Sequence, residues 1–374
     1  MIHTYKELPF TNIYNITRKT FTYDSVFFDI ETTGFSPKQT QLYLIGCAYR
    51  KDDHIVIEQF YAENMQEEKE ILCVFFDLLA SFHTIITFNG IGFDIPYLKT
   101  KCLQFDLSDP FIDFSYVDIF KSVHKLKHIL KLENYKQKSI EQFLQLSRDD
   151  LYSGGDLIPI YHAYCKEPTD NSLSLLLLHN YEDVLGMIEL VPILSYVHLF
   201  QGHIKEVSSF EVCNCKNYDG SCGQELILTI VPQFELPQKI SYRFWNIYLT
   251  AYKSQVQLVI PIIRNDLKYF FPNWKDYYYL PLEDIAVPKS IASYVDKEQR
   301  QQAKASTCYT KKTSAFLPQF NREFSSPAFY QNYGDKISYF EYSDALLEKK
   351  EFVTGYVKHI LSTITNPNLK LPIV

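Results

Sequence analysis

Five side chains in three short segments are of types that could handle phosphate esters. Asp29 and Glu31 end the apolar run SVFFDIE, and Asp94 follows the segment TIITFNG. His179 and Asp183 lie in the apolar segment LLLLHNYEDVLGMIEL. Carboxylates are preferred ligands of hard divalent cations, and two such cations can stabilise the attacking and leaving oxygens of a phosphoryl displacement. An imidazole, with an unperturbed pKa of about 6.5, can accept a proton at neutral pH.

Each segment alone also has an ordinary structural explanation. Asp29 and Glu31 alternate along a strand, so they project to one side and could be solvated charges at its end. Asp94 could stabilise the N-terminus of a following helix. His179 and Asp183, four residues apart, share one helical face and could be a satisfied pair in the core. Together the three segments predict one site, and without a cation there, Asp29 or Glu31 should have a raised pKa.

The surrounding pattern predicts a mixed α/β sheet. Apolar runs at 25–31, 41–50 and 54–62 read as three strands joined by short turns, which implies antiparallel neighbours. Residues 66–82 have helical spacing, and 84–90 read as a buried strand that returns with a right-handed crossover. Further helices are expected near 118–131, 138–146, 156–166 and 171–191, the last ended or kinked by Pro192.

A chain of 374 residues is expected to contain two domains. We place the boundary near residue 201, which gives domains of 1–200 and 201–374. In the second part, 225–231, 239–252 and 256–263 resemble strands, and 290–305 resembles one helix. The prediction is a smaller α+β domain of unknown role.

Composition places the chain among ordinary globular proteins, with 46% hydrophobic and 22% charged residues. The first residues lack the apolar core of a signal peptide, and Glu189 and Pro192 interrupt the longest apolar stretches, so we expect a cytoplasmic protein without a membrane partner. In that compartment the eight cysteines should be free thiols. We attribute the 16% aromatic content mainly to compositional bias rather than base stacking.

The three acidic segments resemble the DEDD family of ribonuclease-H-like 3′–5′ exonucleases, in the DEDDh branch that has His in its last motif. DIETTG is similar to motif I, FNGIGFDIPYL to motif II and HNYEDV to motif III. The stretch LENYKQKSIEQFLQLSRDDLYSGGDLIPIYHAY resembles YprB-like bacterial ribonuclease-H-like domains, so the resemblance covers about residues 24–194. It implies a ribonuclease-H-like fold and two Mg²⁺ or Mn²⁺ ions. Its implied ligands are Asp29, Glu31, Asp94 and Asp183, with His179 as the general base.

A nucleic-acid partner, with a single-stranded DNA or RNA 3′ end, follows from this resemblance, although the net charge is −7. Residues 1–200 carry 17 Lys and Arg against 27 Asp and Glu, whereas the rest carry 20 against 17. Within the acidic half, segment 121–138 holds six lysines and two histidines against one acid. The segment could contact phosphates, or it could be a solvated helix face whose lysines cover apolar side chains.

Two features of the second half have bland interpretations that we favour. The aromatic segment 265–281 could stack on bases, but the core of a small domain explains it better. Cys213, Cys215 and Cys222 could bind zinc only if His203 or Cys308 supplied a fourth ligand, so a β-hairpin with free thiols is favoured.

The leading hypothesis is a metal-dependent 3′–5′ exonuclease that hydrolyses nucleic-acid phosphodiester bonds. One alternative is a nucleic-acid-binding or adaptor protein that keeps the fold with little turnover. The basic segment 121–138 favours this alternative. Another is a ribonuclease-H-like endonuclease.

Overall fold

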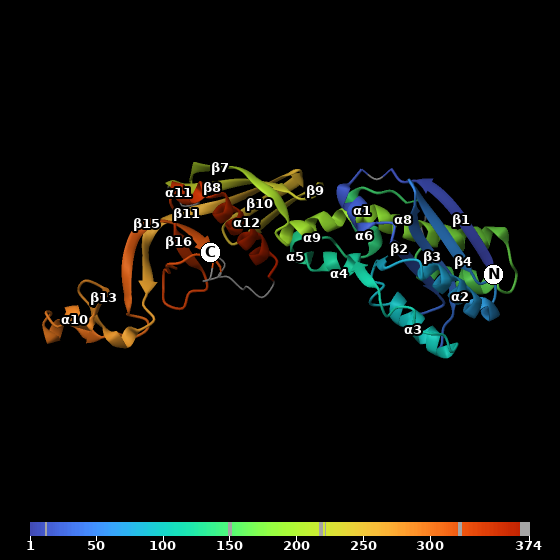
Figure 1. Cartoon of the computed structure of the whole chain (residues 1–374), viewed down its shortest axis with the longest axis horizontal. Helices are drawn as coiled ribbons and strands as arrows, with labels where there is room; N and C mark the ends of the chain where they lie inside the picture. Colours follow the sequence, from blue (N-terminus) through green and yellow to red (C-terminus); the bar gives the residue numbers. More distant parts are fainter. Residues whose placement is uncertain (12, 149–151, 217–219, 221, 321–323, 367–374) are drawn as a thin grey trace. The chain divides into compact units, whose positions relative to one another are not determined.

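The computed structural model describes residues 1–11, 13–148, 152–216, 220, 222–320 and 324–366. The chain divides into two compact units (Figure 1). Unit 1 comprises Met1–Val197 with Phe234–Gln238, and unit 2 comprises His198–Gln233 with Lys239–Val374. The acids and the histidine identified from the sequence all lie in unit 1.

Unit 1 is built on a six-stranded sheet in the order β1-β4-β3-β2-β5-β6. The four strands of the first part pair in antiparallel fashion, and β5 and β6 add to β2 as parallel strands. This confirms the predicted mixed sheet; the edge strands β1 and β6 were not predicted. The strands are β1 (Ile2–Pro9), β2 (Ser25–Thr32), β3 (Leu42–Lys51), β4 (His54–Tyr61), β5 (Thr84–Thr87) and β6 (Ser115–Asp118).

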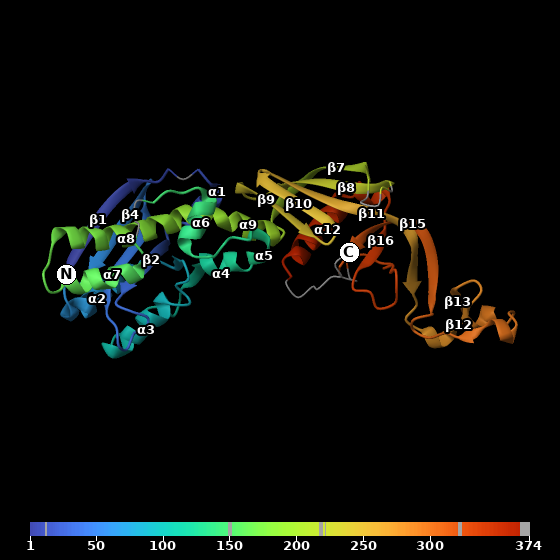
Figure 2. The ribbon, with the colours of Figure 1, turned by 180° about the vertical axis from the view of Figure 1, so that it is seen from behind.

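The two faces of the central strand β2 carry different kinds of side chain. Val26, Phe28 and Ile30 join a buried core with helix α2 (Glu68–Leu79) and helix α3 (Asp94–Gln104). The alternating residues Asp29 and Glu31 point to the opposite side of the sheet, where both contact helix α8 (Asp170–Leu190). Figure 2 shows α8 crossing in front of the strands. The prediction that the two acids share one face is therefore confirmed.

Helix α8 is long because its ends and its sides are well defined. The Thr169 hydroxyl accepts a hydrogen bond from the Ser172 backbone N–H and caps the N-terminus. At the other end Pro192 lies in a short 3₁₀ turn, η2 (Val191–Ile193), which separates α8 from α9 (Leu194–Phe200). By length and hydropathy, 170–200 could span a membrane, but 72% of its most apolar window is buried inside the protein.

The other predicted helices of unit 1 lie at or near their expected positions, whereas α1 was not predicted. The helix expected over 118–131 is divided into α4 (Ile119–His124) and α5 (Lys127–Leu130), because Leu126 interrupts the regular turns between them. The remaining bounds are α1 (Asn15–Thr20), η1 (Met65–Glu67), α4 (Ile119–His124), α5 (Lys127–Leu130), α6 (Gln137–Leu144) and α7 (Gly154–Tyr164).

Unit 2 is dominated by antiparallel strands. A seven-stranded sheet contains the path β16-β15-β11-β10-β9, with β8 paired to both β11 and β7. The terminal helix α12 buries an apolar face that includes Val353, Tyr356 and Ile360. The elements are β7 (Ile204–Lys216), β8 (Cys222–Pro232), β9 (Leu236–Phe244), β10 (Ile247–Lys253), β11 (Gln255–Phe270), β15 (Tyr309–Gln319), β16 (Ser338–Glu341), α11 (Asp344–Leu347) and α12 (Lys350–Ile364).

The single helix predicted over 290–305 is wrong. The segment forms a short helix α10 (Lys289–Ala292), a 3₁₀ turn η4 (Lys297–Gln299) and a two-residue strand β14 (Gln301–Gln302). Strand β14 pairs with β12 (Tyr277–Leu280), which also pairs with β13 (Ile285–Pro288). Sheet pairing with β12 therefore overrides the helix propensity of the Lys, Glu, Gln and Ala residues.

The aromatic segment of unit 2 packs on a small core, and its three neighbouring cysteines lie on paired strands. Phe271 stacks on Tyr277 with ring centroids 4.8 Å apart, and both pack against a small core that contains Cys308. Cys213 and Cys215 lie on β7, and Cys222 begins the antiparallel partner β8. All eight cysteines are free thiols. Among the described residues, the group of side chains close enough together to hold a metal ion contains none of these cysteines.

Candidate functional site

Strand β2 supplies two acids from the middle of the sheet. Asp29 lies opposite Gly46 of β3, and Glu31 lies opposite Leu44. The pairing register shifts between Glu31 and Thr32, where β2 ends. Glu31 is buried and Asp29 is half-buried. The covalent geometry of the strand therefore fixes two carboxyl groups side by side beneath helix α8.

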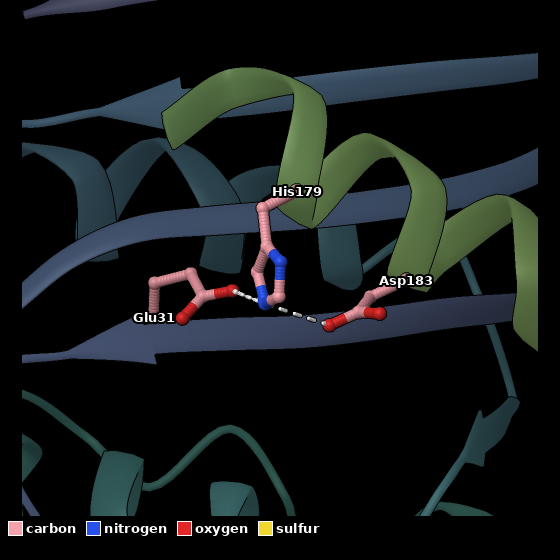
Figure 3. A group of neighbouring side chains, drawn as sticks. All are labelled: Glu31, His179 and Asp183. Carbon is pink, nitrogen blue, oxygen red and sulfur yellow. Dashed lines mark ion pairs between the residues drawn. The ribbon is translucent and has the colours of Figure 1, made fainter. Parts of the chain in front are cut away.

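Helix α8 supplies a histidine and an acid from one face. His179 Nε2 lies 3.5 Å from Glu31 Oε1 and 3.3 Å from Asp183 Oδ2 (Figure 3). One ligand atom from each of these three residues lies within 4.8 Å of the other two. The i,i+4 spacing read from the sequence thus brings His179 and Asp183 together over Glu31, as expected for neighbours on one helical face.

Asp94, in the first turn of α3, contacts the backbone of strand β2. Its Oδ1 accepts a hydrogen bond of 3.1 Å from the backbone N–H of Ile30, the residue between the two acids of β2. Burial raises the pKa of Asp94 to about 7, with the charge of Asp118 adding to the effect, although the Ile30 N–H opposes it. Asp94 is therefore tied to the backbone of β2, which the simple helix-capping explanation did not include.

Electrostatic repulsion links Asp29 to the other acids. Burial raises the pKa of Asp29 well above its usual range, and the charges of Asp94, Asp183 and Glu31 raise it further. A hydrogen bond of 3.2 Å from Asn180 Nδ2 to Asp29 Oδ2 acts in the opposite direction. The expectation that one of the β2 pair has a raised pKa agrees with the direction found for Asp29.

Asn180 orients Asp29, and sequence reasoning missed this role. Its side chain is fully buried, and its Oδ1 accepts a hydrogen bond of 3.0 Å from Gln59 Nε2. The amide lies directly over Gly46, where an added Cβ would be only 1.9 Å from Asn180 Oδ1. A signal was present in the sequence: Asn180 lies four residues from both Leu176 and Val184, so it is a polar residue in an apolar stripe.

Arg148 also belongs to the site and was not identified from the sequence. Its Nη2 pairs with Asp183 Oδ1, and its Nη1 lies 3.3 Å from Glu141 Oε1 on helix α6. Gln137, the first residue of α6, donates a hydrogen bond of 2.9 Å from Nε2 to the backbone carbonyl of Asp183. No local sequence pattern around Arg148 predicts these contacts, because they form only when α6 packs on α8.

The chemistry of these donors fits divalent cations. Carboxylate oxygens from Asp29, Glu31, Asp94 and Asp183 are hard ligands, and such ligands suit Mg²⁺ or Mn²⁺. Burial raises the pKa of Asp29 most, and repulsion from the charges of the neighbouring carboxyl groups adds to it. A bound cation would relieve this repulsion and hold the acids in their ionised form.

Comparison with known proteins agrees with the fold of unit 1. Residues 26–195 match the profile of the RNase H superfamily. The uncharacterized protein YprB of Bacillus subtilis (strain 168) is 27% identical over 184 residues, which cover 48% of this chain. The matched region is only 43% of the length of YprB.

Similarities to solved structures are more distant. The family B DNA polymerase of Pyrobaculum calidifontis gives a TM-score of 0.37 at 18% identity, covering 47% of this chain and 25% of the polymerase. E. coli exonuclease I in complex with a dT13 oligonucleotide gives a TM-score of 0.32 at 12% identity, covering 56% of this chain and 55% of the exonuclease chain. The profile match spans β2 through α8 and therefore every acid of the site. Residues 26–195 are thus a domain of the RNase H superfamily, distantly related to YprB.

Proposed function

We propose that this protein is a metal-dependent 3′–5′ exonuclease that hydrolyses nucleic-acid phosphodiester bonds. The observation that carries the proposal is the arrangement of four carboxyl groups and one imidazole, from three separate segments, around Asp29 and Glu31 of the central strand β2. The RNase H superfamily match of residues 26–195 supports the nuclease class.

The proposed ligands of two Mg²⁺ or Mn²⁺ ions are Asp29, Glu31, Asp94 and Asp183. When bound, such ions stabilise negative charge on the oxygens of a phosphodiester under attack. The protein fixes its acids before substrate arrives, because Asp94 is bonded to the Ile30 N–H and Asp29 to Asn180. This preorganisation avoids rearranging charged groups during the reaction.

His179 is proposed as the general base. Its Nε2 faces the space between Glu31 and Asp183, so an attacking water there would lie within reach of the ring nitrogen. The imidazole would accept the proton of that water as its oxygen attacks phosphorus and the bond to the leaving 3′ oxygen breaks.

The test is cleavage of single-stranded DNA and RNA oligonucleotides labelled at the 5′ end, with Mg²⁺ or Mn²⁺. The proposal predicts a descending ladder of products, which EDTA and Asp29→Asn abolish. A purified protein that leaves both polymers intact with both metals would contradict the enzyme proposal. Cleavage of a circular single strand would instead identify an endonuclease.

A second candidate, binding without turnover, is favoured by the lysines of segment 121–138. It predicts binding that weakens with salt and survives Asp29→Asn, with no cleavage by the unaltered protein. We assign unit 2 an accessory role. Altering its exposed aromatic residues Tyr248 and Tyr252 tests this role, when the substrate preference of the variant is compared with that of the unaltered protein.

A further inference from the structure

A hollow lined by aromatic side chains lies in unit 1. Its volume is about 470 Å³, within the usual range of ligand-binding pockets. The rings of Phe88, Phe120, His124 and Tyr135 line it. Phe88 follows strand β5, Phe120 and His124 lie one turn apart on α4, and Tyr135 precedes α6. Three separate segments therefore build the walls.

The rings form a connected set that remains partly open to solvent. Phe120 and His124 stack with centroids 5.3 Å apart at an interplanar angle of 29°, and Phe88 meets Phe120 edge-on at 5.8 Å. The Tyr135 hydroxyl donates a hydrogen bond of 3.1 Å to the carbonyl of Lys127, which fixes its ring. Phe88, Phe120 and Tyr135 are half-buried, and His124 is exposed. An additional planar ring can therefore stack here with little rearrangement of the protein.

Two polar residues connect the hollow to the acidic site. Gln137 lines the hollow and donates its Nε2 hydrogen bond to the carbonyl of Asp183. Asn89 also lines it, from the turn that leads into Asp94. Asp118 holds that turn through the Asn89 backbone N–H, at 3.2 Å. Gln137 and the turn at Asn89 thus connect the hollow to the segments that carry Asp183 and Asp94.

The charge around the hollow is complementary to a phosphate backbone. Lys136 lines it directly, and Lys121, Lys125 and Lys127 belong to the same segment. Within the described part of the chain, none of these four ammonium groups has an ion-pair partner. Ammonium groups without a carboxylate partner remain available to neutralise phosphates.

We propose that the hollow formed by Phe88, Phe120, His124 and Tyr135 binds an unpaired nucleobase of a single-stranded substrate. The proposal rests on the proposed nuclease function and adds where the strand lies: one base stacks in the hollow while a phosphodiester lies at the acids. Stacking engages the face that every base possesses, so this subsite tolerates different sequences. A base in a duplex cannot enter, because its faces are covered by its neighbours.

Binding can be measured independently of cleavage. The probe is a 5′-fluorescein single strand of about ten nucleotides, in deoxythymidine and uridine forms, with full-length Asp29→Asn protein in Mg²⁺. Phe120→Leu keeps apolar bulk but removes the ring, and His124→Ala removes the exposed ring that stacks on Phe120. Each change should weaken binding by about 5- to 150-fold in fluorescence anisotropy, the range found for losing one base–aromatic stack. The control Tyr5→Ala, an exposed aromatic on the opposite edge strand β1, should not change the affinity.

An abasic scan of the oligonucleotide separates stacking from a general loss of fold. Removing the base at one position should lower the affinity of the protein for the oligonucleotide. The same removal should cause no further loss of affinity in the Phe120→Leu protein. Unchanged affinity of both pocket variants, or equal sensitivity to the abasic position in the variant, would overturn the inference. If the deoxythymidine and uridine strands bind with similar affinity, the base itself is the ligand. A loss of affinity confined to one of the two strands would contradict stacking that is independent of the sugar.

Failure of the inference and failure of the proposed function have different outcomes. If the unaltered protein cleaves but the pocket variants bind normally, the nuclease proposal stands and the subsite is wrong. If the abasic signature is found but the unaltered protein never cleaves, the subsite stands in a binding protein. Absence of any binding to either single strand would overturn both.

Discussion

The contact between Gly46 and Asn180 makes a quantitative prediction about how the site is supported. A Cβ placed on Gly46 would lie 1.9 Å from Asn180 Oδ1 and 2.8 Å from its Cγ, so Gly46→Ala must displace the amide. The displaced side chain would lose its bonds to Asp29 and Gln59. Each buried hydrogen bond contributes about 0.5 to 1.5 kcal/mol, and a group left unsatisfied costs about 1 to 3 kcal/mol more. We expect Gly46→Ala to lower the free energy of unfolding of unit 1 by about 2 to 4 kcal/mol.

A double-mutant cycle tests whether this loss comes from the proposed clash. Asn180→Ala alone should cost a similar amount, because it loses the same hydrogen bonds. In the double variant Gly46→Ala/Asn180→Ala no amide remains to be displaced, so its cost should be close to that of either single change. The coupling energy should then be about 2 to 4 kcal/mol in favour of the double variant. Additive losses would refute the assignment.

The assay can distinguish the two units. Both tryptophans of the chain, Trp245 and Trp274, lie in unit 2, so their fluorescence reports the unfolding of that unit. The urea midpoint of this fluorescence transition should be the same in the variant and in the unaltered protein. Far-UV circular dichroism follows both units and should show the earlier transition of unit 1. Gly155→Ala is the matched control, since its added Cβ would meet no atom closer than Ser153 Oγ at 3.9 Å. A comparable loss in that variant would mean that glycine replacement itself, and not the Asn180 contact, is responsible.

Three further predictions concern charge in the acidic site. In EDTA, the folded state binds a proton at Asp94 with a pKa of about 7 against 3.8 for the free group, so stability should fall as pH rises from 4 to 7, by about 4 kcal/mol through this group. Urea titrations should show this slope flattened in Asp94→Asn, and stability that rises over the same window would contradict it. Arg148→Gln removes a cation beside Asp183 and should tighten Mn²⁺ binding about 10-fold in calorimetry, with Arg148→Lys as the charge-preserving control; weaker binding by the Gln variant would show that Arg148 supports the metal site instead. His179→Gln should reduce cleavage by about 10²-fold or more while Mn²⁺ binding stays within a few-fold of normal. Parallel loss of metal binding would make His179 a ligand rather than the base.

The part of the fold that positions the acids could be predicted from the sequence because short-range patterns encode it. Alternation along 25–31 and the apolar spacing of α8 each reflect burial against a single neighbouring layer. Strand β1 lacked such a signal, since five of its eight residues are exposed at the sheet edge. The segment 290–305 was assigned wrongly because its local propensity is helical while its pairing partner β12 is supplied by tertiary structure.

The site itself was predictable only in its acids and its histidine. These residues have chemical types that stand out at strand ends and in an apolar helix. Arg148 and Gln59 could not be found in this way, because their roles depend on contacts with Asp183 and Asn180, residues 35 and 121 positions away. Asn180 was detectable in principle, but its neighbours His179 and Asp183 were the more conspicuous polar residues of α8.

The alternation along β2 also constrains how this protein can change over time. The odd-numbered positions carry Asp29 and Glu31, and the even-numbered positions carry core residues such as Phe28 and Ile30. Inserting or deleting one residue here would turn the aromatic and aliphatic groups toward α8 and the acids into the core, so chemistry and stability would be lost together. Point substitution of an acid leaves the core intact. Lineages that lose the proposed activity should therefore do so through single replacements that preserve the length of this strand, and they would keep a folded protein free to acquire another use.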